Sequence, residues 1–389
     1  MNKSIYLDYA SMGITSNETI KTIERMMRKL VLSSGNITGT DRTFELLGVY
    51  EETRETIARF LDTTSQQIAL INNTTHGLGL IATSLSLKKT DHILVPDIEF
   101  ISLALVWRRL QKKIGFKIRE IPTRKGTIDI KDILDRADEH TRVIVLSAVQ
   151  EVSGHRIDLD QFSQFTKKND IFLIVDGIQE CGVHKVNVSA ADAYIVGGHK
   201  WLGSPFGLGF MYLSRRLINQ VDPAYDGYFN LEEPIGGWER YLQSRNRHIL
   251  DNHVVKNEAR KFEPGGMPNF TGALGLNCAI KNLDMEQVEE KVKVLNRVFR
   301  DNLRSMNLEN FILGNKSIKH RSGILTLSLS GGFEEEKKLL ATLRKHDIQT
   351  SLRSIAGVGG IRFSFYFPTT IDDINRTSEI IEHLRNRLG

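Results

Sequence analysis

Lys200 is the residue of this sequence whose setting most favours covalent chemistry. It follows the apolar run that begins "YIVGGHKW" and precedes a loop rich in glycine and proline, "LGSPFGLG". A lysine amine is a nucleophile only when it is unprotonated, and partial desolvation at a strand end beside cationic groups favours that state. The glycines allow the backbone to approach a ligand closely. Lys200 is therefore suited to forming a Schiff base with an aldehyde cofactor.

Asp176 is a candidate partner for such a cofactor. It ends the apolar run "IFLIVD" and lies 24 residues before Lys200, a spacing that fits a strand, a short crossover and a second strand. Both residues would then lie at the carboxyl ends of strands, where open α/β sheets bind ligands. A carboxylate that keeps a pyridinium nitrogen protonated makes the ring an electron sink. The alternative for Asp176 is a turn or cap residue.

The segment "NTTHG", residues 73–77, lies between a predicted strand and a predicted helix. Hydroxyl groups and free N–H groups at a helix N-terminus make a seat for a phosphate group. The alternative is helix capping by Thr74 or Thr75 without any phosphate.

A competing pattern overlaps this segment. Residues 77–82 fit the relaxed dinucleotide signature G-x-G-x-x-A, with Asp97 and Glu99 at a suitable distance. These glycines fall inside the apparent helix rather than in the turn, and a dinucleotide enzyme would leave Lys200 and Asp176 unexplained. A nicotinamide-dependent oxidoreductase therefore remains only as a rival hypothesis.

Helical patterns alternate with short apolar runs over the first two thirds of the chain, which predicts a mainly parallel sheet covered on both faces. We expect a large domain at 15–245, a smaller α+β C-terminal domain at 246–389, and an N-terminal segment 1–14 that packs near the active site. The predicted strands are 68–71, 92–95, 116–121, 142–149, 171–176 and 193–198.

The composition narrows the class of protein. The 389 residues carry a formal net charge of +5 without any block of like charges, so we expect no nucleic-acid partner. The two cysteines cannot form a disulfide framework, which suits a reducing compartment. The sequence shows no signal peptide and no apolar stretch of membrane-spanning length, so we expect a cytoplasmic protein without a membrane partner.

Seven segments together resemble the class V aminotransferase family of pyridoxal phosphate enzymes, which includes isopenicillin N epimerases, cysteine desulfurases and kynureninases. The resemblance extends over nearly the whole chain and implies an aspartate-aminotransferase-like fold, fold type I. The segments are "YLDYAS", "NNTTHGL", "DIEFIS", "VDGIQ", "GGHKWLGSPFGLGF", "RKFEPGGMPNF" and "IRFSFYFPTTIDDI".

The resemblance implies roles for residues around the cofactor ring. Lys200 would form the Schiff base with pyridoxal phosphate, and Asp176 would pair with the pyridine nitrogen. Gln179 would donate a hydrogen bond to the phenolic oxygen. Phe100, where desulfurases use a histidine, would stack on the ring. From the residues alone, Phe100 is equally a packing residue and Gln179 a helix-surface residue.

It also implies how the phosphate and the substrate would be held. Thr75, the backbone of His76, and His199 would bind the phosphate. Arg362, in "IRFS", would bind the substrate α-carboxylate, a task that suits a bidentate guanidinium. The family builds each active site from two chains, so the resemblance also implies a homodimer.

Some positions depart from the family pattern. Gly197 stands where the family often has a serine two residues before the histidine, and Gly266 or Met267 replaces a hydroxyl residue that reaches the partner subunit's phosphate, with Thr271 the nearest hydroxyl. Neither Cys181 nor Cys278 lies in "SLRSIAGVGG", the predicted loop before Arg362. On that ground we expect the chain not to be a persulfide-forming cysteine desulfurase.

The expected activity is that of an aminotransferase or a carbon–sulfur (β-elimination) lyase acting on the α-amino group of a small amino acid. An amino-acid epimerase or racemase, and a non-catalytic scaffold with the same fold, remain alternatives. The aromatic and basic segment 225–250 either lines the side-chain pocket or forms a solvated interface loop. From the sequence we expect no bound metal ion.

Overall fold

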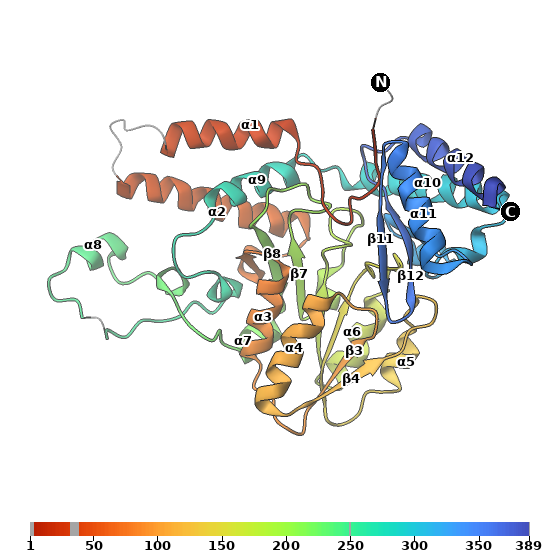
Figure 1. The fold of residues 1–389 in the computed structure, drawn as a ribbon. Helices are drawn as coiled ribbons and strands as arrows, with labels where there is room; N and C mark the ends of the chain where they lie inside the picture. The colour runs from red at the N-terminus through yellow and green to blue at the C-terminus, as the bar shows by residue number, and fades with distance from the viewer. Residues whose placement is uncertain (1–3, 32–38, 249, 389) are drawn as a thin grey trace.

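The computed structural model describes residues 4–31, 39–248 and 250–388. Figure 1 shows a central sheet with helices against it, a second unit formed mainly by the C-terminal part of the chain, and an arm that projects from the body around α8.

The central sheet has seven strands in the order β2-β8-β7-β6-β5-β3-β4. Only β8 runs against the others, because β2 and β7 both pair with it antiparallel and the remaining pairs are parallel. The predicted mainly parallel sheet is confirmed. The strands are β2 (Ile68–Ile71), β3 (His92–Pro96), β4 (Lys117–Ile121), β5 (Thr141–Ser147), β6 (Phe172–Asp176), β7 (Ala193–Gly197) and β8 (Gly209–Leu213).

Helices cover both faces of this sheet. Successive strand residues point to opposite faces, so a run that is apolar throughout fills two cores at once. In β5, for example, Ile144 and Leu146 belong to one core, whereas Val143 and Val145 belong to the other. The first core is closed by α2 (Gly39–Phe60), α5 (Ile130–Leu134), α6 (Asp160–Lys168) and α9 (Phe270–Lys281), and the second by α3 (Thr74–Ser84), α4 (Ile101–Ile114) and α7 (Arg215–Gln220).

The second unit has its own core around a three-stranded antiparallel sheet in the order β11-β12-β9. The N-terminal segment joins this core, since β1 pairs parallel with β10 and Leu7 is fully buried. The predicted domain limits stay a prediction. The elements are β1 (Ile5–Tyr6), α10 (Met285–Ser305), β9 (Ile324–Leu327), α11 (Gly332–Lys345), β10 (Ile348–Gln349), β11 (Ser351–Ile355), β12 (Val358–Ser364) and α12 (Ile371–Leu388).

Several strands were not predicted from the sequence, among them β8 and β11. The segment before Arg362, predicted to be a loop, is the hairpin of β11 and β12, which turns at Ala356 (φ 50°) and Gly357 (φ 74°). Two successive residues with positive φ suit the twist of a tight hairpin, but alanine at the first position hides the signal. Strand β8 was also not among the predicted strands, because it follows directly on the glycine-rich loop.

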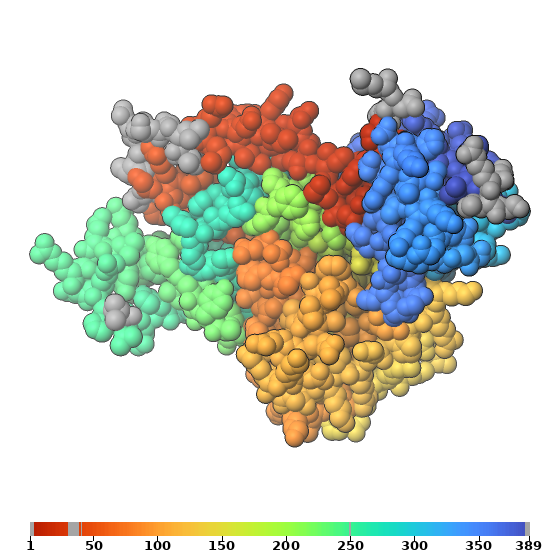
Figure 2. Space-filling model, viewed as in Figure 1, coloured from red at the N-terminus to blue at the C-terminus, as the bar shows by residue number. Residues whose placement is uncertain are grey.

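An arm between about residues 225 and 256 projects from the body and carries the short helix α8 (Gly237–Gln243) (Figures 1 and 2). Several of its apolar side chains are exposed, and Ile235 is fully exposed. Helix α1 (Asn17–Met26) packs on α9 at the same end of the molecule. None of the helices in the described part of the chain combines the length and hydrophobicity of a membrane-spanning helix.

Candidate active site

The loops that follow the parallel strands converge on one pocket at the carboxyl edge of the central sheet. Strands β2, β3, β5, β6 and β7 all contribute residues at or just after their ends, as the parallel arrangement requires. Most of the predicted site residues meet there. The pocket is lined by Asn73, Thr74, Thr75, Leu78, Phe100, Ser102, Ser147, Glu151, Asp176, Ile178, Gln179, His199 and Lys200.

Lys200 lies in the loop after β7. Its Nζ is 5.9 Å from the centre of the Phe100 ring and forms no hydrogen bond or ion pair with a described residue. Burial lowers the pKa of Lys200 from its ordinary value to about 8, against the attraction of Asp176, which raises it. The amine is thus partly unprotonated near neutral pH, which a nucleophilic lysine needs. Phe100 is 43% exposed and leaves a ring face open on the pocket.

Asp176 ends β6 and is buried. Burial raises its pKa to about 6, although the N–H of Ile178, which donates to Oδ1 over 2.9 Å, and the charge of Lys200 both favour the ionised form.

The N-terminus of α3 faces the same pocket, and its cap is Asn73 rather than Thr74 or Thr75. Asn73 Oδ1 accepts the backbone N–H of His76 over 2.9 Å. The backbone N–H of His76, which we predicted to bind the phosphate, is therefore already hydrogen-bonded to Asn73. His76 also does not line the pocket. Thr75 is exposed and lines the pocket, and its contact with a phosphate stays a prediction.

Thr74 was missed as a ligand-binding candidate. Its hydroxyl is buried and has no hydrogen-bond partner within the described structure. It lies beside Gly197, where an added Cβ would come within 3.1 Å of Thr74 Oγ1 and 3.3 Å of His199 Cε1. Gly197, at a position where the family often has a serine, thus leaves room for the hydroxyl of Thr74, which comes from another segment.

His199 lines the pocket next to Lys200, and its ring stacks on Phe206 at 5.4 Å between centroids. Burial lowers its pKa, so the imidazole is mainly neutral near pH 7. A neutral imidazole can donate one hydrogen bond to an anion without a charge of its own.

Gln179 is buried at the pocket wall. Its Oε1 accepts the Trp201 indole N–H over 2.8 Å, and its Nε2 donates to Ala10 O over 3.0 Å. These contacts fix the amide orientation and leave one Nε2 hydrogen for a ligand.

Arg362 lies in β12 and is almost fully buried. Its Nη1 donates to Glu151 Oε2 over 2.8 Å, while Nη2 donates to Ser11 Oγ over 2.7 Å and lies 3.4 Å from Asp8 Oδ1. Arg362 itself does not line the pocket, whereas Glu151 does. Glu151 thus separates Arg362 from the pocket, and only Nε of the guanidinium has no hydrogen-bond partner among the described residues.

Glu151 and Ser147 were not recognised from the sequence. Ser147 is the last residue of β5, inside the strand that we predicted at 142–149, and Glu151 follows it. A polar residue at the carboxyl end of a buried strand is the signal that could have found them. Ser147 donates from both its backbone N–H and its hydroxyl to the buried Glu99. Burial raises the pKa of Glu99 to about 7.

The rival dinucleotide pattern has no support in this geometry. Gly77 and Gly79 both lie inside α3, and Gly77 packs against Ile71 and Ile195 rather than facing a ligand. The segment 225–250, one candidate for the side-chain pocket, contributes no described residue to the pocket of its own chain.

The family follows from a comparison of the whole sequence. The family model Aminotransferase class-V matches residues 5–377. The chain belongs to the class V aminotransferase family. This confirms the predicted family, its type I fold and an enzyme dependent on pyridoxal phosphate.

Similar class V proteins carry cysteine desulfurase names. The chain is 24% identical over 353 residues to a "Probable cysteine desulfurase" of Pyrococcus abyssi, covering 86% of this chain and 83% of the relative. The apo structure of a cysteine desulfurase from Thermococcus onnurineus NA1 superposes with a TM-score of 0.84 at 21% identity, over 98% of this chain and 94% of the other. The cystine C–S lyase C-DES, solved with its product cysteine persulfide, gives a TM-score of 0.82 at 18% identity, over 98% and 97%.

These relatives overturn one expectation. We excluded a cysteine desulfurase because no cysteine lies just before Arg362, but several proteins similar to this chain are named cysteine desulfurases. The exclusion rested on the position of a single thiol, whereas the similarity to these relatives extends over most of the chain.

Proposed function

We propose that this protein is a pyridoxal phosphate-dependent carbon–sulfur lyase of the cysteine desulfurase type, acting on L-cysteine. The observation that carries the proposal is the pocket at the carboxyl edge of the sheet, where the unpaired amine of Lys200 lies with the buried Asp176 and with Glu151, the partner of Arg362. The names of the family relatives point to sulfur chemistry.

The residues in this pocket fit pyridoxal phosphate. Thr74 offers a buried hydroxyl without a partner beside Gly197, Thr75 and His199 add polar groups, and α3 directs the positive end of its dipole toward the pocket. These groups would hold the phosphate. The ring would lie between Phe100 and Asp176, with Gln179 at the phenolic oxygen.

When bound, pyridoxal phosphate supplies an aldehyde that takes up the substrate amine and a ring that stabilises a carbanion at the α-carbon. As a carboxylate, Asp176 would keep the ring nitrogen protonated, and the Ile178 N–H and the charge of Lys200 favour this ionised form against the effect of burial. Lys200 removes the α-proton and returns it to carbon, since its lowered pKa leaves part of the amine free at neutral pH.

Arg362 would bind the α-carboxylate of L-cysteine once Glu151 has moved away. Ser11 and Asp8 keep the guanidinium in place during this exchange, since both contact Nη2 while Glu151 contacts Nη1. The substrate is thereby oriented with its α-hydrogen toward Lys200.

A homodimer forms part of the proposal. The arm around α8 leaves Ile235, Leu250 and Val254 largely exposed, which a second copy would cover. The same contact would bring the segment around Gly266 and Thr271 toward the partner's active site.

Product analysis tests the proposal. We expect the purified protein, supplied with pyridoxal phosphate, L-cysteine and dithiothreitol, to form alanine and sulfide in equal amounts. One dithiothreitol is oxidised to its disulfide for each cysteine, because its thiols accept the sulfur and reduce it to sulfide. Pyruvate, ammonia and sulfide would indicate β-elimination instead, and a keto acid that retains sulfur would indicate transamination. Absence of all these products with a bound cofactor would contradict the proposal.

A further inference from the structure

A groove with a basic rim lies outside the active site, between the loop that follows β5 and helix α10. Its volume is about 610 Å³, which falls within the range of roughly 300–1,000 Å³ typical of small-molecule sites. The floor is buried and is formed by His184, Val292, Asn296 and Ser322.

The charges around the groove are unbalanced. Two carboxylates, Glu289 and Glu290, face five cationic side chains. Glu289 is already engaged, because it lies 3.5 Å from Lys293 and 3.3 Å from the His184 ring. The five cations are Arg156, Lys293, Arg297, Lys319 and Arg321.

Three of these cations form no ion pair among the described residues, although Asp301 and Glu309 attract Arg321 from a greater distance. Arg156 pairs with Glu180 at 2.8 Å, but Arg297, Lys319 and Arg321 form no ion pair with any carboxylate in the described ranges. The Arg321 guanidinium is nevertheless held in place, since Nε and Nη2 both donate to Lys316 O, over 3.2 and 2.8 Å. An immobilised, unpaired guanidinium is a ready donor for an oxyanion.

A buried arginine behind the groove adds to this imbalance. Arg300 is 6% exposed, and its Nε donates to Asn296 Oδ1 in the groove floor, but it has no carboxylate partner in the described structure. Burial first, and then the charge of Arg321, lower its pKa to about 10. The charge of Glu309 opposes this repulsion only in part, and an anion in the groove would offset it further.

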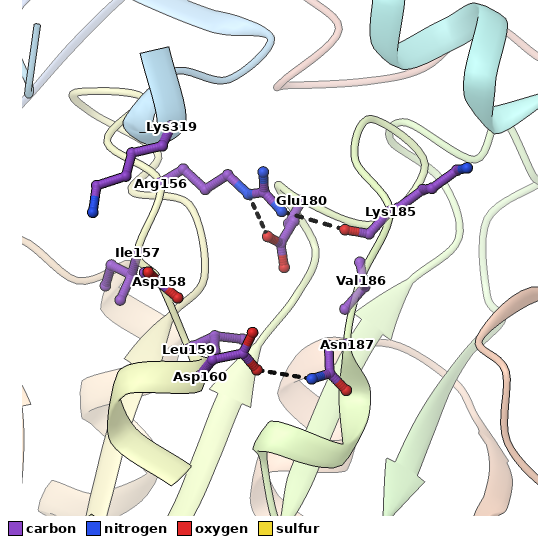
Figure 3. A pocket seen from close by; sticks show the side chains of 10 residues that line it. All are labelled: Arg156, Ile157, Asp158, Leu159, Asp160, Glu180, Lys185, Val186, Asn187 and Lys319. Carbon is purple, nitrogen blue, oxygen red and sulfur yellow. Dashed lines mark hydrogen bonds and ion pairs between the residues drawn. The ribbon is translucent and has the colours of Figure 1, made fainter. Parts of the chain in front are cut away.

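The groove continues into a second pocket of about 250 Å³, drawn in Figure 3. Arg156 and Lys319 line both spaces. In Figure 3 their side chains lie near one end of the pocket, and the hydrogen-bonded pair Asp160 and Asn187 lies at the other. The cationic groups are therefore concentrated where the two spaces join.

We propose that this groove binds a small molecule that carries phosphate or carboxylate groups. Its oxyanions would contact Arg297, Lys319 and Arg321, and its body would lie over the buried floor. Because the walls come from the central-sheet unit and from α10, the bound molecule would hold the two units together and raise the unfolding temperature.

Inorganic pyrophosphate is a suitable probe. Titration is done calorimetrically on protein saturated with pyridoxal phosphate, so that the phosphate seat of the active site is filled. We expect saturable binding by the wild type and a weakening of about tenfold or more in the double variant Arg297→Ala/Lys319→Ala, because each charge-assisted hydrogen bond contributes substantially. The matched control, Arg344→Ala/Lys345→Ala at the exposed end of α11, should bind like the wild type.

Thermal unfolding without pyrophosphate checks that both double variants are folded. Equal binding by wild type and both variants would place the anion elsewhere and overturn the proposal. Failure of the wild type to bind pyrophosphate, inorganic phosphate or citrate at millimolar concentrations would overturn it as well.

Discussion

The active-site pocket and the basic groove both gather charged side chains between segments far apart in the sequence, but they treat charge differently. In the pocket, Lys200 is attracted by Asp176, and Arg362 is paired with Glu151. In the groove, Arg297, Lys319 and Arg321 form no ion pair among the described residues. In the pocket, burial moves the pKa values of Lys200 and Asp176 toward neutrality, so these groups can transfer protons. The cations on the partly open rim of the groove can only attract anions. The first region is thus equipped for chemistry and the second for binding.

Replacement of the pocket lysine should have the largest effect. Lys200→Ala removes both the amine that captures the cofactor and the group that moves the α-proton, so alanine formation from L-cysteine should fall by about 10³-fold or more. Lys338→Ala, an exposed lysine of α11, is the matched control and should keep full activity. If the Lys200→Ala protein retained a tenth of the activity, the pocket could no longer be distinguished from the basic groove as the region equipped for chemistry.

Cofactor capture should depend steeply on pH. The pKa of Lys200 is lowered to about 8, so below pH 8 the neutral fraction of the amine falls about tenfold per pH unit, and above pH 8 it levels off. The rate at which pyridoxal phosphate binds the cofactor-free protein, followed by stopped-flow absorbance, should rise from pH 7 to 8 and then reach a plateau. Asp176→Asn removes an attraction that raises this pKa and should shift the midpoint to lower pH. A midpoint near 10.5 in the wild type would contradict the account.

The buried hydroxyl of Thr74, which has no hydrogen-bond partner among the described residues, should contribute to cofactor affinity. Thr74→Val preserves the shape of the side chain and removes one hydrogen bond to the phosphate, so the Kd of pyridoxal phosphate should rise by about fivefold to tenfold. Thr83→Val, at a threonine whose hydroxyl donates within the same helix, is the control and should leave this Kd unchanged. An unchanged Kd in Thr74→Val would show that the phosphate is held by other groups.

Replacement of Glu151, whose carboxylate the substrate would displace from Arg362, should have the smallest effect. Glu151→Gln removes the negative charge that competes with the substrate carboxylate, so KM for L-cysteine should fall about threefold with kcat little changed. Initial rates over a range of L-cysteine concentrations separate the two parameters. A raised KM would mean that Glu151 positions Arg362 for the substrate rather than occupying its place.

The pocket was largely predictable from the sequence, because its geometry follows from a simple rule. Apolar runs such as 68–71 and 171–176 announce strands covered on both faces, and parallel strands bring the residues after their carboxyl ends together. Lys200 and Asp176 could therefore be assigned to one site before their distances were known, whereas Phe100 was assigned to it through the family resemblance. Their roles in catalysis remain predictions until variants are measured.

Other features could not be predicted because they depend on tertiary packing. Thr74 rather than His76 faces the pocket because Asn73 takes the cap, and adjacent polar residues give no signal of that choice. The groove depends on α10 lying against Arg156 and His184, segments more than 100 residues away, whose side chains look like ordinary surface charges in the sequence.

The attachment of the cofactor tests the central claim most directly. The protein is incubated with pyridoxal phosphate, reduced with borohydride, digested and mapped by mass spectrometry, with Lys200→Ala treated in parallel. The account predicts that the wild type loses its visible absorbance on reduction and carries the label on the peptide containing Lys200, and that the variant carries none. A label on another lysine, or a wild-type protein that takes up no cofactor, would contradict it.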